Sequence, residues 1–232
     1  MNNKLWARLA AVGLSLAATP SWSQAPPAVA GPSVGQQLIH LDTALAVGVR
    51  CDWLRPIQRL GLEAALRQSR AAITAAQGPA GLTAAEAANR VALEPIKTFD
   101  CAAPQATAVR ANVETAADEV VATHLFRAEQ IATFDAPWAK GVARLKPSTK
   151  DITDVLAKLR ADNPQRMTQI AAANSPTMAM AVLALNCKER RGAKAVCPQA
   201  GNPSPADMAF VHSWLDDTET FAAAYFATQP PP

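Results

Sequence analysis

The hydrophobic and polar positions of this chain follow the spacing of α-helices. After residue 33, apolar side chains recur every three or four positions, which places them on one face of a helix. The first such stripe has spacings of three, four, four and four, and consists of Leu38, Leu41, Leu45, Val49 and Trp53. Long alternating runs of Val, Ile and Thr, which are typical of strands, are absent from the sequence. The pattern therefore predicts an all-α fold built as a multi-helix bundle.

Capping residues, prolines and glycines divide this pattern into separate helices. We expect each helix to begin at a cap residue or a proline, and these starts are Ser33, Pro56, Thr83, Pro104, Ser148, Asn163, Ser175 and Ser204. A break after Gln77 is predicted by the glycines and the proline that follow it. The helical domain covers residues 33–228, and a subdivision would fall near residues 135–147, where two prolines and a glycine occur.

The chain begins with the layout of a secretory signal peptide. Lys4 and Arg8 precede an apolar run over residues 9–18, and small residues then lead to a cleavage point after Ser23. Residues 1–23 are therefore predicted to be removed, and residues 24–32 form a Pro/Ala-rich leader with no reason to fold. This organisation predicts a periplasmic or secreted protein.

The charge of the chain argues against a nucleic-acid partner, and the length of its apolar runs argues against a transmembrane segment. The formal charge of +3 falls to about +1 once Lys4 and Arg8 leave with the signal. Nucleic-acid binding needs strong, clustered basicity, so we expect no nucleic-acid partner. The apolar run of the signal and the stretch over residues 178–185 are both shorter than the roughly 20 residues that cross a bilayer, so no transmembrane segment is expected after signal removal.

Export to an oxidising compartment makes the four cysteines candidates for disulfides. Cys51 lies near the end of the first helix and Cys101 just after the third, so helices that run up, down and up bring both to one end of the bundle. Cys187 and Cys197 flank a short turn. We predict two structural disulfides, Cys51–Cys101 and Cys187–Cys197, although four cysteines allow three pairings. A redox-active pair is disfavoured because the C-x-x-C spacing is missing.

Two short motifs resemble a known group of proteins. Cys51-Asp52-Trp53-Leu54 and Asp100-Cys101 are similar to the motifs of an uncharacterised family of exported, disulfide-containing helical proteins of proteobacteria. In that family a Cys-x-Trp-Leu closes one helix and an Asp-Cys precedes a later one. The resemblance covers about the first third of the mature chain, agrees with the Cys51–Cys101 pairing and implies no catalytic residue.

The candidate nucleophile and histidines do not assemble into an active site. Residues 31–35 match G-x-S-x-G, but a nucleophile elbow needs a preceding strand, so Ser33 is interpreted as a helix cap. His124 falls on an apolar stripe and is predicted to be buried, or alternatively to act as a ligand or general base in a helical crevice. His212 has Asp216 four residues later, which could orient its ring. No catalytic residue, metal-ligand set or cofactor is predicted.

The remaining polar and aromatic features each have a structural interpretation. His40 is expected to be solvated, and Asp42 is expected to pair with an arginine such as Arg50, Arg55 or Arg59. The basic cluster of Lys188, Arg190, Arg191 and Lys194 suits the end of a helix, or else a loop that docks an anionic partner. The aromatic residues near the C-terminus are expected in the core, and an exposed stripe would instead indicate a binding face; these are Phe210, Trp214, Phe221 and Tyr225.

Three functions are compatible with these features. The sequence favours a non-enzymatic interaction or structural protein of the cell envelope, with an envelope protein as its partner. The first alternative is a small-ligand binder or hydrolase whose site lies in a helical crevice and involves His124 or His212. The second is a helical envelope-stress chaperone that uses the aromatic C-terminal helix as its client surface.

Overall fold

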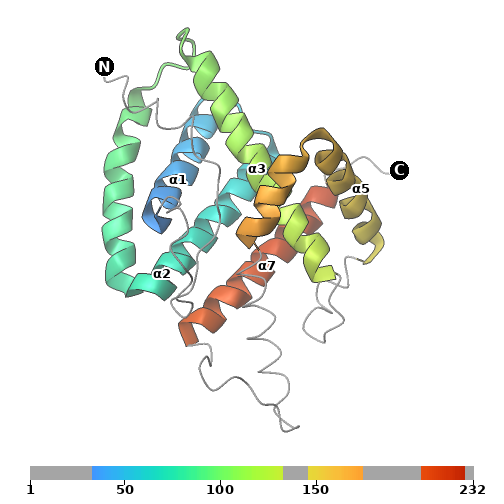
Figure 1. Cartoon of the computed structure of the whole chain (residues 1–232). Coiled ribbons are helices and arrows are strands. Elements are labelled where there is room, and N and C mark those ends of the chain that lie inside the picture. The colour runs from blue at the N-terminus through green and yellow to red at the C-terminus, as the bar shows by residue number, and fades with distance from the viewer. Residues whose placement is uncertain (1–32, 133–145, 175–204, 228–232) are drawn as a thin grey trace. The chain divides into compact units, whose positions relative to one another are not determined.

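The computed structural model describes residues 33–132, 146–174 and 205–227, and the structural statements below concern these residues (Figure 1). Their regular elements are helices, and no strand occurs among them, which confirms the predicted all-α fold. The helices are α1 (Val34–Arg50), α2 (Pro56–Leu93), the 3₁₀ helix η2 (Glu94–Thr98), α3 (Ala106–Ala132), α5 (Lys146–Asp162) and α7 (Pro205–Ala227). A further helical stretch covers residues 164–174. The start predicted at Ser175 lies outside the described residues.

The chain divides into two compact units, and the boundary between them follows Val121. Among the described residues, unit 1 consists of residues 33–121, and unit 2 consists of residues 122–132, 146–174 and 205–227. The boundary falls inside α3. The subdivision expected near residues 135–147 falls almost entirely outside the described residues and stays a prediction.

Helix α1 begins at the cap that the sequence predicts. The Ser33 hydroxyl accepts a hydrogen bond from the Gln36 backbone N–H at 3.3 Å, and the Gln36 side chain accepts one from the Ser33 N–H at 2.9 Å. This reciprocal pair is a capping box, which satisfies two N–H groups that the helix itself cannot. Ser33 is therefore a structural cap, as expected.

The predicted apolar stripe of α1 is right over its first half and wrong over its last turn. Leu38 and Leu41 are buried, whereas Val49 is 44% exposed and Val47 takes the buried place. The helix ends at Arg50, so Trp53 lies beyond it. Val47 is buried instead of Val49 because the chain turns back on the end of α1 and covers the face that carries Val47.

That turn depends on a close approach at Gly48. The Trp53 N–H donates to the Gly48 carbonyl at 2.9 Å, and Leu54 packs over the glycine. A Cβ atom at Gly48 would lie 2.5 Å from the Leu54 side chain, closer than packed carbon atoms come. The absence of a side chain at Gly48 thus allows residues 51–54 to fold against α1.

Helix α2 is a hairpin of two helical arms rather than one rod. Gly78 has φ 70° and ψ −178°, a conformation that glycine alone adopts readily, and Pro79 opens the second arm. The break predicted after Gln77 is therefore confirmed. The start predicted at Thr83 is wrong, because Thr83 lies inside the second arm and its hydroxyl donates to the Pro79 carbonyl at 3.1 Å.

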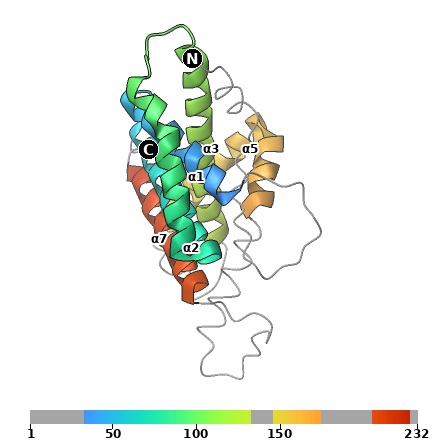
Figure 2. The ribbon, with the colours of Figure 1, turned by 90° about the vertical axis from the view of Figure 1, so that its left-hand side faces the viewer.

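Polar contacts hold both arms of α2 against α1. The Asn89 amide donates to Asp42 on α1 at 2.5 Å, and the Arg70 guanidinium lies 3.9 Å from Asp42 and 3.3 Å from Glu86. Figures 1 and 2 show α1 beside the two arms in both views. Asp42 thus pairs with an arginine, as expected, but this is Arg70 of the first arm rather than Arg50, Arg55 or Arg59, and Asn89 of the returning arm completes the contact.

The core of unit 1 lies between α1, α2 and the first part of α3. Leu41, Leu62 and Ile73 are among its fully buried side chains, and Ala117 and Val120 contribute from α3. A second cluster covers the end of α1, and its buried members are Val47, Ile96, Val109 and Val113. The stripe predicted for the helix after Pro104 is confirmed from Val109 to His124, since these side chains are buried.

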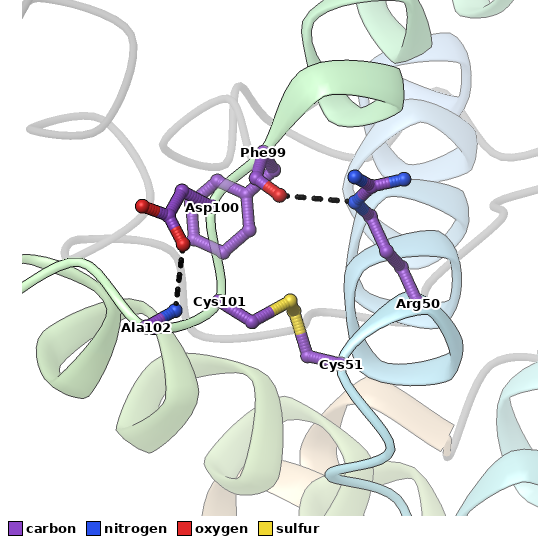
Figure 3. The surroundings of a disulfide bond; sticks show 6 residues. All are labelled: Arg50, Cys51, Phe99, Asp100, Cys101 and Ala102. Atoms are coloured by element: carbon purple, nitrogen blue, oxygen red, sulfur yellow. Dashed lines mark hydrogen bonds between the residues drawn. A yellow bond between two sulfur atoms is a disulfide. The ribbon is translucent and has the colours of Figure 1, made fainter.

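A disulfide joins the end of α1 to the segment before α3. Cys51 and Cys101 are bonded, as the order of the helices predicts, and are 50 residues apart in the chain (Figure 3). The Arg50 guanidinium donates to the Phe99 carbonyl at 3.0 Å beside the bond, and the Trp53 and Phe99 rings meet edge to face at 6.1 Å. Closing a loop of this length stabilises the fold by roughly 4 kcal/mol in the chain-entropy model.

The second predicted disulfide stays a prediction, because Cys187 and Cys197 lie outside the described residues.

We expect Gly78→Ala to destabilise unit 1 by about 1–3 kcal/mol, because a Cβ atom strains a backbone held at positive φ. Gly35→Ala is the matched control. Gly35 is helical and a Cβ atom there would have nothing within 4 Å, so that substitution should be neutral or stabilising by up to about 1 kcal/mol. Urea denaturation, with hydrogen exchange of peptides from α2, measures both effects. Equal stabilities for the two variants would contradict the hairpin conformation at Gly78.

Candidate functional site

The residues that the sequence nominates for chemistry do not all fall within the described part of the chain. His124 lies on α3 in unit 2 and Asp216 is exposed on α7. His212 is also part of α7, but its side chain lies outside the described residues, so its pairing with Asp216 stays a prediction. Arg190 and Arg191, with the basic cluster around them, lie outside the described residues as well.

His124 is fully buried, with an exposed fraction of 0%. Its ring stacks on the Phe221 ring of α7, with 4.7 Å between the ring centroids and 27° between the planes. The prediction that the apolar stripe of α3 buries this histidine is confirmed. A ring in this position packs two helices together and is closed to solvent.

Arg127, one turn after His124, is the most unusual group in unit 2. Only 2% of it is exposed, its Nε donates to Asn174 Oδ1 at 2.6 Å, and its guanidinium carbon lies 5.5 Å from the centre of the Trp214 ring. Burial lowers the pKa of Arg127 to about 9, and the charge of Asp217 opposes that shift. The buried guanidinium is therefore bonded to an amide, lies over an aromatic face and is attracted by the charge of a carboxylate.

The partners of Arg127 are themselves fixed by their helices. The Asn174 amide donates to the Ile170 carbonyl at 2.7 Å, and this bond turns the Asn174 oxygen toward Arg127. On α7, Trp214 and Asp217 are three residues apart and so share one helix face. The Thr218 hydroxyl donates to the Trp214 carbonyl at 2.7 Å and needs no partner outside the helix.

An ion pair connects α3 to α5 in the same unit. Both nitrogens at the tip of Arg160 reach Glu129, at 2.5 and 3.2 Å, and the Glu129 side chain is mostly buried. The hydrogen bond to Glu129 raises the pKa of Arg160, with burial acting in the opposite direction. A two-pronged pair of this kind fixes orientation as well as distance.

We refer to His124, Arg127, Asn174, Trp214, Asp217 and Phe221 as the Arg127 cluster. Chemically it is a compensated buried charge, which sets the register of the helices around it. Arg127 was not among the residues nominated from the sequence, although a signal for it existed. It lies seven residues after Val120 and three after His124, so it falls on the same buried stripe of α3. Asn174 is separated from Arg127 by 47 residues and carried no such signal.

The aromatic residues of α7 pack as the sequence predicts. Trp214 and Phe221 are each 1% exposed, and Tyr225 is partly buried beside Phe221. The side chain of Phe210 lies outside the described residues. Trp214 and Phe221 thus belong to the core of unit 2 and present no exposed stripe.

Two further properties of the described residues bear on the class of protein. They hold no group of three or more His, Cys, Asp or Glu side chains placed to bind a metal ion. None of their helices combines the length and the apolar character needed to span a bilayer.

Comparison with known proteins identifies no relative of this chain. The chain matches no protein-family model, no curated protein and no solved structure. Its function is therefore inferred from the sequence features and the contacts described above.

We expect Arg127→Met to destabilise the protein by about 3–5 kcal/mol, because it leaves Asp217 as a buried charge without the guanidinium. The matched control is Arg110→Met. Arg110 pairs with Glu114 at 2.8 Å, but both side chains are substantially exposed, so its loss should change stability by no more than about 0.5 kcal/mol. Urea denaturation followed by circular dichroism compares the two. Losses of similar size would contradict the central role of Arg127.

His40 should make unit 1 less stable in acid. It is half-buried on α1 rather than solvated as expected, and burial lowers the pKa of its ring from 6.5. The unfolded chain then binds the proton more readily, so stability falls as pH drops from 6.5 toward the lower pKa of the folded state. We expect His40→Gln to reduce the slope of stability against pH between about 7 and 5. Denaturation midpoints at several pH values test this, and identical slopes for both proteins would refute it.

Proposed function

We propose that this protein is an exported, periplasmic helical protein that serves as a non-enzymatic interaction or structural component of the cell envelope. The layout of residues 1–23 as a signal peptide supports export. The disulfide between Cys51 and Cys101 fits an oxidising compartment. The resemblance of Cys51-Asp52-Trp53-Leu54 to exported helical proteins of proteobacteria points in the same direction.

The non-enzymatic part of the proposal rests on the Arg127 cluster, whose buried side chains contact one another. A general base must reach its substrate within hydrogen-bonding distance, and His124 is fully buried against Phe221. Arg127 contacts Asn174 and Trp214 and is 2% exposed. The side chains best suited to chemistry in the described part of unit 2 are thus engaged in joining helices.

The second predicted disulfide, Cys187–Cys197, belongs to the same proposal. It closes a short loop that contains Arg190 and Arg191, and a pinned basic loop suits an acidic surface on an envelope partner. In this scheme the two disulfides stabilise a scaffold, and the basic loop contributes to recognition.

A small-ligand binder, with its site in a helical crevice, stays the alternative. The chaperone alternative gains no support from Trp214 and Phe221, which are buried and so are not part of an exposed client surface.

Native mass spectrometry of the protein from an oxidised periplasmic extract tests this proposal. We expect a mass that lacks residues 1–23 and four hydrogens, since each disulfide removes two. A loss of two hydrogens would indicate the Cys51–Cys101 bond alone. Recovery of the uncleaved chain from the cytoplasm would contradict export.

The same spectrum separates the two candidate functions. A chain or homo-oligomer with nothing bound is the expected result for the interaction protein. A bound small mass would instead favour the small-ligand binder.

A further inference from the structure

Helix α3 belongs to both units. It is a single helix of 27 residues; its first sixteen residues lie in unit 1 and its last eleven in unit 2. The first part begins five residues after Cys101, and its buried side chains, Val109, Val113, Ala117 and Val120, pack in the core of unit 1. The disulfide of unit 1 is thus placed at the start of the helix that continues into unit 2.

The last eleven residues of α3 contact every other described helix of unit 2. His124 stacks on Phe221 of α7, Arg127 bonds to Asn174 of the helical stretch 164–174, and Glu129 pairs with Arg160 of α5. His124 and Arg127 share one face only when this segment is helical. The three contacts by which α3 joins the other helices of unit 2 therefore depend on residues 122–132 being helical.

Eleven residues are too few to form a stable helix alone, because helices shorter than about 12–15 residues are marginal in water. Extending a helix that already exists is far easier than starting one, since each added residue gains a hydrogen bond without a new nucleus. The sixteen preceding residues, docked in unit 1, supply such a start. Unit 1 in turn is held by the Cys51–Cys101 bond, which closes a 50-residue separation.

We propose that formation of the Cys51–Cys101 disulfide is the step on which the folding of unit 2 depends, and that the continuous helix α3 transmits this dependence. The two thiols lose two electrons and two protons as the S–S bond forms, and a protein or small-molecule disulfide in the exported compartment takes them up as it becomes two thiols. With the thiols reduced, unit 1 loses its constraint and residues 122–132 lose their helical start. The chain would then stay incompletely folded until it is oxidised.

Hydrogen exchange with mass spectrometry on the full oxidised chain tests this dependence. In the double variant Cys51→Ala/Cys101→Ala we expect exchange to accelerate at least about tenfold in peptides from α1, from residues 122–132 and from α7. The control variant is Arg110→Met, which removes only an exposed ion pair of α3 and should leave exchange unchanged. The proposal fails if residues 122–132 and α7 exchange as in the parent protein, or if the control accelerates them equally.

A second variant keeps the disulfide and interrupts only the helix. Two glycines inserted between Val121 and Ala122 should accelerate exchange at least about tenfold in residues 122–132 and α7 and leave α1 unchanged. Two glycines inserted between Gly78 and Pro79, where the helix is already broken, are the matched control and should leave unit 2 unchanged. Unit 2 protection that survives the Val121 insertion would overturn the role of α3. Neither experiment requires export, so a failure here is distinguishable from a failure of the proposed function.

Discussion

The Cys51–Cys101 bond holds the end of α1 at the start of α3, and the core of unit 1 is built against that corner. The close approach of Leu54 to Gly48 and the edge-to-face contact of Trp53 with Phe99 both depend on the chain turning there. Between the two cysteines lie both arms of α2 and the helix η2. A bond across this span lowers the entropy of the unfolded chain, which is worth roughly 4 kcal/mol in the chain-entropy model.

The constraint on unit 2 is different, because its core contains the charged side chain of Arg127. Burying Arg127 is costly unless its partners are well placed, and Asn174, Trp214 and Asp217 meet that need from two other helices. Such clusters specify how helices align more than they add to stability. The same requirement leaves His124 and Arg127 closed to solvent.

Features that depend on neighbouring residues were predictable from the sequence. The cap at Ser33, the helix start at Pro56 and the break at Gly78 each follow from local backbone chemistry. The burial of His124 followed from its place on the stripe of α3. The pairing of Cys51 with Cys101 followed from counting helix directions, because sequential helices with short connections alternate.

Features that depend on distant segments were decided only by the tertiary structure. Asp42 pairs with Arg70 and Asn89, and Val49 is exposed, because of how the arms of α2 and the turn after α1 return to the first helix. The sequence of α3 alone determined that Arg127 lies on the buried stripe, but Asn174 decides how that charge is accommodated. Helical periodicity and capping are properties of contiguous residues, whereas the partner of a buried polar group is chosen by which remote helix packs against it.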